Sequence, residues 1–314
     1  MLKPKRLEKG DTIGIISPAS SPRNKSKVKQ AIKVFEGWGY KVKLGKYIYD
    51  EYYYLAGRDK CRVEDLNKFF ADDAIDAIFC STGGYGAMRI LKDIRYDVIK
   101  KNPKIFLGFS DITALHLAIH KMTGLVTFHG PIAEEINSNT GYIVDYLNKA
   151  LFSAKPIGTI EMASRDKHLV KIVSGKAKGR VVGGNLTLVC STLGTPYEID
   201  TKGKIVFLEE VQEAPYRVDR YFSQLLNAGK LQEAVGIVIG ECVKCESSTS
   251  THESRKSRRI KEIIFDLLAP LKIPIIYGLP IGHTKDIATI PIGVEACLDA
   301  SRGEFSIDEV ATTP

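Results

Sequence analysis

Short apolar runs alternate with longer segments of helical periodicity through the first half of the chain. The short runs predict strands, and the periodic segments predict helices. In chain order, the predicted strands are Thr12–Ser17, Tyr40–Leu44, Ala77–Cys80 and Ile105–Leu107, and the predicted helices are Lys25–Trp38, Arg58–Ala71, Ala87–Leu91 and Ile112–Lys121. Strands that alternate with helices predict a parallel sheet with helices on both faces, the doubly wound arrangement of an α/β protein.

The pattern changes after residue 152. Residues 153–178 are rich in Lys, Ser and Gly and lack sustained periodicity, which is typical of a linker between domains. Beyond them, the predicted strands are Gly179–Val182, Lys204–Leu208, Gly236–Ile239 and Ile275–Tyr277, and the predicted helices are Leu186–Leu193, Arg217–Ala228 and Ile260–Leu268. We therefore predict an N-terminal domain over residues 1–152 and a C-terminal domain over residues 179–314.

Three loops of the first half follow predicted strands, at the edge of a parallel sheet where ligands bind. They are Ser17–Pro22, Ser81–Gly86 and Gly108–Asp111. In the third loop, Ser110 lies at a sharp strand-to-helix turn, which projects a hydroxyl from the backbone beside the free amides of the first helical turn. A serine before Asp111 is also an ordinary helix N-cap, and Ile112 replaces the small residue of an α/β-hydrolase elbow. This segment is compatible with either a nucleophile or a cap.

The sequence Gly83-Gly84-Tyr85-Gly86 connects a predicted strand to a predicted helix. Its amides could cradle a phosphate or complete an oxyanion hole. Its spacing matches neither the dinucleotide fingerprint nor the P-loop. The glycines would equally serve a tight connection with positive φ angles.

The second half supplies a candidate acid and a candidate base. Glu209 and Glu210 end an apolar strand, where a carboxylate can orient a histidine in a triad or simply face solvent. His283 lies in a loop rich in glycine and proline, and loops on a rigid scaffold commonly display bases. It is the best candidate base among the six histidines. His116 and His120, one helical turn apart, lack the glutamate that a zinc-binding helix pattern requires.

Composition narrows the class of protein. A length of 314 residues, with 44% hydrophobic and 26% charged residues, is ordinary for a globular protein of two domains. No apolar stretch is long enough to span a bilayer, and the N-terminus lacks the apolar segment of a secretory signal. We therefore expect a cytoplasmic location and no membrane partner.

The spacing of the cysteines and the net charge limit the kinds of metal, substrate and nucleic-acid partner that we expect. The six cysteines are scattered and predicted to be free thiols, and the single close pair, Cys242 and Cys245, is too little for a metal site. The net charge of +8 suits a substrate rich in carboxylates. The basic run 254–259 follows a Ser/Thr-rich stretch typical of a solvated loop and accompanies no nucleic-acid motif, so we expect no nucleic-acid partner.

Several ordered motifs resemble those of the L,D-carboxypeptidases, a family of serine peptidases that trim muropeptides and that includes the microcin C self-immunity peptidases. The motifs are Gly108–Leu115, Thr127–Pro131, Gly183–Leu186, Phe207–Glu210 with Pro215–Arg217, and Gly278–His283. The similarity begins at Gly10 and covers nearly the whole chain. It implies a doubly wound N-terminal domain and a smaller, β-rich α/β C-terminal domain that meet at the active site.

The resemblance also implies a Ser-Glu-His triad. Ser110 would be the nucleophile, Glu209 the residue that orients the histidine, and His283 the general base. The amides of Asp111 and of the Gly83-Gly84 turn would form the oxyanion hole. Glu210 does not match the triad position. The family requires no metal or organic cofactor, and its members are often homodimers.

The substrate that the resemblance implies is the peptide bond between the L-centre of a diamino acid, diaminopimelate or lysine, and a terminal D-alanine, as in the cytoplasmic murein tetrapeptide. An exopeptidase needs a cation for the terminal carboxylate, and Arg89 and Arg217 are candidates, although each could instead be a structural ion-pair partner. One alternative is hydrolysis of an amide between a peptidyl group and a nucleotide analogue. Another is a non-catalytic two-domain protein that binds a ligand.

Overall fold

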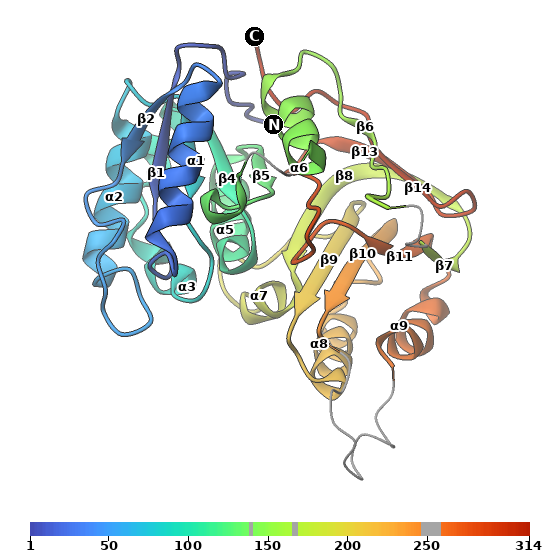
Figure 1. Ribbon diagram of the computed structural model, residues 1–314. Coiled ribbons are helices and arrows are strands. Elements are labelled where there is room, and N and C mark those ends of the chain that lie inside the picture. Colours follow the sequence, from blue (N-terminus) through green and yellow to red (C-terminus); the bar gives the residue numbers. More distant parts are fainter. Residues whose placement is uncertain (138–140, 165–168, 246–258) are drawn as a thin grey trace.

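A computed structural model of the protein describes residues 1–137, 141–164, 169–245 and 259–314. These residues form two sheets, each with helices packed against it, and the two ends of the chain lie close together (Figure 1). Lys5 forms a β-bridge with Thr313. Residues 254–258 of the basic run lie outside the described residues.

The first sheet has the strand order β12-β5-β4-β3-β1-β2. Its strands are β1 (Thr12–Ile16), β2 (Lys41–Leu44), β3 (Ala77–Cys80), β4 (Ile105–Gly108), β5 (Thr127–His129) and β12 (Ile290–Ile292). All neighbours pair in parallel except β12, which arrives from the far end of the sequence and runs antiparallel to β5. Strands β3 and β4 are buried on both faces, and for this reason their sequences are continuous apolar runs.

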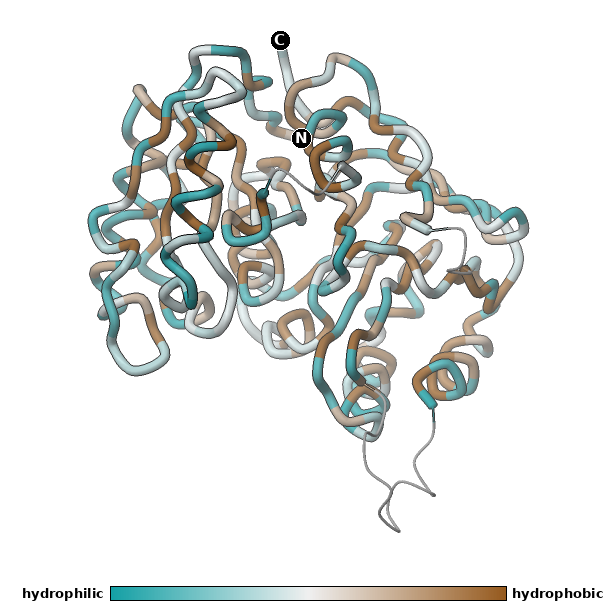
Figure 2. The backbone as a smooth tube through the Cα atoms, in the orientation of Figure 1, coloured by the Kyte–Doolittle hydropathy of each residue, from teal (hydrophilic) through white to brown (hydrophobic). Residues whose placement is uncertain are grey.

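Helices cover both faces of the first sheet. They are α1 (Lys25–Gly37), α2 (Asp59–Ala71), α3 (Ala87–Ile90), α4 (Tyr96–Lys101) and α5 (Thr113–Thr123), and α6 (Gly141–Leu147) is the next helix along the chain. Ile15 of β1 belongs to the same buried cluster as Phe35 of α1, whereas Ile78 of β3 belongs to a second cluster with Leu66 of α2. The apolar residues accordingly concentrate between the layers (Figure 2). This arrangement confirms the predicted doubly wound domain.

The second sheet has the order β6-β14-β13-β8-β9-β10-β11-β7. Its strands are β6 (Gly158–Thr159), β7 (Val170–Val173), β8 (Lys176–Asn185), β9 (Ile205–Val211), β10 (Gly236–Val243), β11 (Ile275–Leu279), β13 (Glu295–Asp299) and β14 (Glu304–Ile307). The central strands β8 to β11 are parallel, and the flanking strands pair antiparallel. The range 153–178, predicted as a linker, contains β6, β7 and the first residues of β8.

Helices α7 (Leu186–Ser191), α8 (Pro215–Asn227) and α9 (Ile260–Leu268) follow strands of the second sheet. Helix α8 begins at Pro215, where the missing amide hydrogen costs nothing. Its residues Val218, Phe222 and Leu225 are buried at helical spacing and hold it against the domain. The second domain is thus also α/β.

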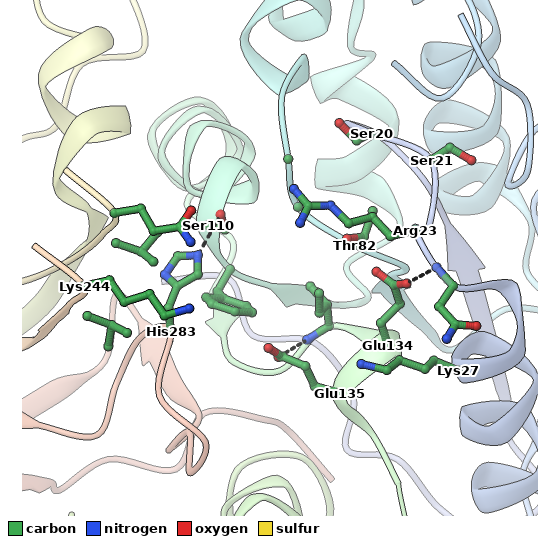
Figure 3. Close-up of a pocket in the computed structure, with 18 residues that line it drawn as sticks. Ser20, Ser21, Arg23, Lys27, Thr82, Ser110, Glu134, Glu135, Lys244 and His283 are labelled. Carbon is green, nitrogen blue, oxygen red and sulfur yellow. Dashed lines mark hydrogen bonds between the residues drawn. The ribbon is translucent and has the colours of Figure 1, made fainter. Parts of the chain in front are cut away.

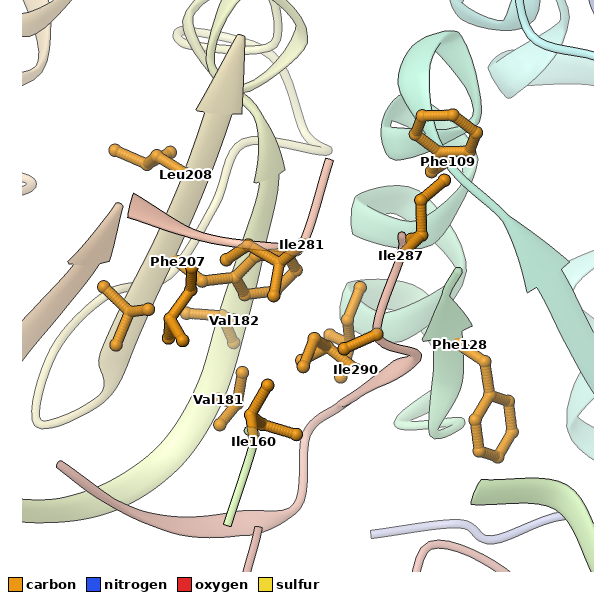
Figure 4. Close-up of a cluster of buried hydrophobic side chains, with 14 of the residues drawn as sticks. Phe109, Phe128, Ile160, Val181, Val182, Phe207, Leu208, Ile281, Ile287 and Ile290 are labelled. Carbon is orange, nitrogen blue, oxygen red and sulfur yellow. The ribbon is translucent and has the colours of Figure 1, made fainter. Parts of the chain in front are cut away.

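One hydrophobic cluster spans both domains. Phe109 and Phe128 of the first domain share it with Val182, Phe207 and Ile281 of the second (Figure 4). Burial of this many large apolar side chains strongly favours the docked arrangement over separated domains. The carboxyl ends of β4 and β9 are therefore held in a fixed relation.

A polar contact reinforces this docking at the end of β8. The amide of Asn185 donates to Oγ1 of Thr113 on α5 over 3.0 Å. Gly184 has a φ of +142°, and a Cβ there would lie 2.5 Å from the Thr113 methyl group. Only glycine permits this close approach of β8 to the helix that follows Ser110.

Candidate active site

Ser110 lies between β4 and α5 in a short 3₁₀ turn, η2 (Ser110–Ile112). Its φ angle is +65°, a left-handed conformation that costs a non-glycine residue about 1–2 kcal/mol. The surroundings fix this turn closely, because a Cβ on Gly83 would lie only 2.9 Å from Cβ of Ser110. A strained residue of this kind is typical of functional sites.

His283 and Glu209 complete a hydrogen-bonded series with Ser110. Nε2 of His283 lies 3.1 Å from Oγ of Ser110, and Nδ1 lies 2.8 Å from Oε2 of Glu209. Glu209 comes from the end of β9 and its side chain is fully buried, whereas His283 comes from the loop after β11 and is 20% exposed. The structure therefore brings together, from both domains, the three residues predicted as a triad.

Glu209 and His283 each stabilise the charged form of the other. Burial raises the pKa of the Glu209 carboxyl, but the hydrogen bond and the charge of His283 outweigh that effect, and the pKa is lowered overall. Burial lowers the pKa of His283, but the hydrogen bond and charge of Glu209 outweigh it, and the pKa is raised overall. This pair stabilises an imidazolium that forms when His283 takes a proton.

Glu210 points away from the histidine, as alternation along β9 requires. Its carboxylate accepts hydrogen bonds from Nδ2 of Asn185 (3.0 Å) and from the amide (2.9 Å) and hydroxyl (2.7 Å) of Thr187. Burial raises its pKa. Glu210 thus ties the start of α7 to β9.

Asp111 turns its side chain into the first domain. Oδ2 of Asp111 accepts a hydrogen bond of 2.7 Å from the amide of Ala87 at the start of α3, and burial raises its pKa to about 6. This bond fixes the Gly83-Gly84 loop, which precedes α3, beside Ser110. The backbone amides of Asp111 and Gly84 have no acceptor within the described ranges, so both can donate to a ligand oxygen.

A cavity of about 630 Å³ opens at Ser110 and His283 (Figure 3). Its charged lining residues are Arg23, Lys27, Glu134, Glu135, Lys244 and His283. The first five were not predicted from the sequence. A signal existed for two of them, because Arg23 directly follows the loop Ser17–Pro22 and Lys244 directly follows β10, both at the carboxyl edge of a parallel sheet.

The structure does not bring Arg89 or Arg217 to the cavity. Arg89 forms a two-pronged ion pair with Asp59, with Nε 2.9 Å from Oδ1 and Nη2 2.8 Å from Oδ2. Nη1 of Arg217 lies 3.4 Å from Oε2 of Glu213. Neither arginine is among the residues that line the cavity around Ser110.

The remaining candidates are separate from this site. Nε2 of His116 lies 2.8 Å from the carbonyl oxygen of Gly108, and Nδ1 of His120 lies 3.1 Å from that of Leu125, so the two rings bond to different partners. All six cysteines are free thiols. Within the described parts of the chain, no helix combines the length and the apolar character that crossing a membrane requires.

The fold and the Ser-His-Glu series define a serine-type hydrolase with two α/β domains. Residues 13–130 match the LD-carboxypeptidase N-terminal domain, and residues 178–298 match the LD-carboxypeptidase C-terminal domain. The chain is 42% identical over 301 residues to the probable murein peptide carboxypeptidase of Bacillus subtilis, covering 95% of this chain and 92% of that protein. The chain belongs to the LD-carboxypeptidase family.

Solved structures share this fold. The structure of MccF in complex with glutamyl sulfamoyl guanosine has a TM-score of 0.89 and 26% identity, with 100% of both chains covered. The muramoyltetrapeptide carboxypeptidase from Oxalobacter formigenes has a TM-score of 0.81 and 28% identity, with 96% of this chain and 100% of that chain covered. These similarities confirm the two-domain α/β prediction and the family resemblance.

Proposed function

We propose that the protein is a serine carboxypeptidase that releases the terminal D-alanine of murein tetrapeptides by cleaving an L,D peptide bond. The observation that carries the proposal is the series Ser110, His283 and Glu209, hydrogen-bonded in that order at the wall of a cavity with cationic side chains. The relative from Bacillus subtilis is named for murein peptides, which supports this class of substrate.

In the proposed reaction, Oγ of Ser110 attacks the carbonyl carbon of the scissile bond while Nε2 of His283 takes the hydroxyl proton. The amides of Asp111 and of the Gly83-Gly84 turn donate to the oxyanion. His283 then gives its proton to the leaving amine of D-alanine, and the carbon–nitrogen bond breaks. Water, deprotonated by the same histidine, hydrolyses the acyl ester and restores Ser110.

Lys244 is our candidate for the terminal carboxylate. It lies beside His283 in the cavity, and it forms no ion pair in the portion of the chain that is described (Figure 3). An ammonium group near the leaving amino acid would favour a free carboxyl terminus. Arg89 and Arg217, the earlier candidates for this role, are already paired with Asp59 and Glu213.

The direct test is to incubate the purified protein with a free murein tetrapeptide and to follow the products by mass spectrometry and a D-amino-acid assay. We expect equimolar tripeptide and D-alanine. A tetrapeptide that ends in L-alanine is the matched control and should remain intact. A folded protein that leaves the D-alanine peptide unchanged would refute the proposal.

A second candidate function is hydrolysis of an aminoacyl nucleotide amide. The exposed rings of Tyr54 and Tyr85 lie 5.3 Å apart, and Oγ of Ser20, a cavity residue, bonds to the backbone of both. Such rings could stack on a nucleobase. Aminoacyl-sulfamoyl adenosine in the same assay distinguishes the two functions.

We also propose a cytoplasmic location and a homodimer. Six free cysteines are typical of a reducing compartment, and a cytoplasmic enzyme would meet murein peptides taken up for recycling. The homodimer is implied by the family resemblance. Light scattering on the purified protein measures it directly.

The rate of D-alanine release should depend on pH through His283. The histidine accepts the Ser110 proton only when it is neutral, and Glu209 raises its pKa despite burial, with smaller contributions from Glu135 and Glu210. We therefore expect kcat/KM to fall as the pH drops through a value above the ordinary histidine pKa of about 6.5. A pH–rate profile that stays flat down to pH 6 would contradict this assignment.

A further inference from the structure

His129 is a buried histidine outside the catalytic series. It is the last residue of β5 in the first domain, and it is fully buried. Nε2 of His129 lies 2.8 Å from the carbonyl oxygen of Ile281, which belongs to the second domain. Because a carbonyl oxygen only accepts hydrogen bonds, Nε2 carries the proton and donates it. The ring therefore links the two domains through a bond of defined direction.

This bond anchors the segment that carries the catalytic base. Strand β11 ends at Leu279, and both Ile281 and His283 lie in the irregular loop beyond it. No backbone amide in the described ranges donates to the Ile281 carbonyl, and Ile281 is itself fully buried. Without His129, that carbonyl would be a buried acceptor without a donor, which is costly. The loop therefore depends on His129 for its position two residues before His283.

The ring of His129 also contacts the segments that carry the other two triad residues. Phe109, directly before Ser110, meets it edge to face, with ring centroids 5.9 Å apart. Phe207, two residues before Glu209 on β9, meets it in the same way at 5.0 Å. Both phenylalanines belong to the hydrophobic cluster that spans the domains (Figure 4). One imidazole thus touches all three segments on which the triad is mounted.

The His129 ring is neutral. Burial lowers its pKa, and this effect outweighs the charge of Glu209 and the hydrogen bond to Ile281, which act in the opposite direction. Nδ1 is buried and bonds to no group in the described part of the chain, so a proton there would be an unpaired buried donor. A neutral ring acts through its position, and its replacement removes no charge from the surroundings of His283.

We propose that His129 is a positioning residue of the active site, which holds the loop of the catalytic histidine against the first domain. It thereby sets the 3.1 Å distance between Nε2 of His283 and Oγ of Ser110. This inference adds a residue to the proposed function and rests on that function for its kinetic test. Misplacement of a catalytic group by about 1 Å can lower the rate by about 100-fold. His129 can therefore control the reaction without touching the substrate.

The kinetic test compares two replacements of His129. His129→Leu fills the space but has no donor, whereas the side-chain amide of His129→Gln can donate from about the position of Nε2. We expect kcat for D-alanine release to fall about 10- to 100-fold in His129→Leu, with little change in KM because His129 does not line the cavity. His129→Gln should recover most of this loss. An unchanged kcat in His129→Leu, or an equal loss in both variants, would overturn the inference.

Two controls separate positioning from loss of stability. His120→Leu removes another bond between a histidine and a carbonyl group, that to Leu125, and His120 does not line the cavity at Ser110, so kcat should be unchanged. Phe305→Leu, in the buried part of β14, should lower the melting temperature while kcat is retained. A loss of kcat in Phe305→Leu as large as that in His129→Leu would overturn the inference.

Nuclear magnetic resonance of the histidine side chains tests the inference without a substrate. In the wild type, His129 should remain the neutral tautomer protonated at Nε2 from about pH 5 to pH 8. In His129→Leu, the pKa of His283 should fall, because a displaced ring loses part of its hydrogen bond and charge interaction with Glu209.

The outcomes of this measurement are distinct from those of the activity assay. Titration of His129 within that pH range in the wild type would overturn the inference, and this result needs no variant. An unchanged pKa of His283 in His129→Leu would overturn it as well. Wild-type protein with the expected resonances but no D-alanine release would overturn the proposed function and leave the positioning role of His129 standing.

Discussion

Replacement of Ser110 with alanine is expected to reduce D-alanine release by about 10⁴- to 10⁶-fold, the range found when a triad nucleophile is removed. The reason is geometric, because Ser110 is the hydroxyl that lies 3.1 Å from Nε2 of His283 inside the cavity. Without it, the histidine has no nucleophile to activate. Single-turnover kinetics with the murein tetrapeptide measure this loss.

The fold should survive the Ser110→Ala change. Alanine keeps the same Cβ in the same left-handed turn, so the strain is unchanged and the melting temperature should shift by only a few degrees. Ser191→Ala, an exposed serine on α7 outside the cavity, is the matched control and should retain full activity. Comparable release by wild type and Ser110→Ala would exclude Ser110 as the nucleophile.

Local sequence patterns predicted most elements of the first domain, because those elements are buried in a regular way. The short elements α4, β5 and α6 were not predicted. The run Ala77–Cys80 coincides with β3, since a central parallel strand is apolar on both faces. Strand β12 was not predicted, because its three residues, which include Pro291, carry little local signal and pair with residues of β5 that lie more than 160 positions earlier in the sequence. Strands β6 and β7 were missed for a similar reason. They are short edge strands whose place depends on partners elsewhere.

In the candidate site, too, some residues have a local sequence signal and others depend on distant parts of the chain. Ser110, Glu209 and His283 could be predicted because each ends or follows a strand and belongs to a motif of the family. The sequence places Arg23 and Lys244 at the carboxyl edge of a sheet, but whether they line the cavity depends on how the two domains dock. Arg89 and Arg217, in contrast, were predicted as binding residues but do not line the cavity. Their sequence context beside the motifs suggested a binding role, but Asp59 and Glu213 occupy their guanidinium groups.

Docking of the domains therefore decides whether Ser110 is reactive. Its turn belongs to the first domain, and its histidine and glutamate belong to the second. The shared hydrophobic cluster and the bond from Asn185 to Thr113 hold these parts in register. A serine that could be a simple helix cap in its own segment thus gains a base only in the complete fold.

Glu209→Gln is expected to lower kcat by about 10²- to 10⁴-fold with little change in melting temperature. Glutamine is the same size, but it carries no charge to stabilise the imidazolium of His283, and its amide cannot enforce the productive tautomer. Loss of the charge should also lower the pKa of His283, which moves the acid side of the pH–rate profile to lower pH. Steady-state kinetics across pH measure both effects.

The adjacent residue provides the control with the opposite outcome. Glu210 accepts hydrogen bonds from Asn185 and Thr187 and lies outside the cavity, so Glu210→Gln places an amide donor against existing donors. We expect Glu210→Gln to cost about 1–3 kcal/mol of folding stability while kcat stays within a few-fold of wild type. Thermal unfolding and kinetics of the two variants should therefore separate cleanly. If Glu210→Gln lost activity and Glu209→Gln kept it, the acid of the triad would have to be reassigned, because only one of two neighbouring strand residues can face His283.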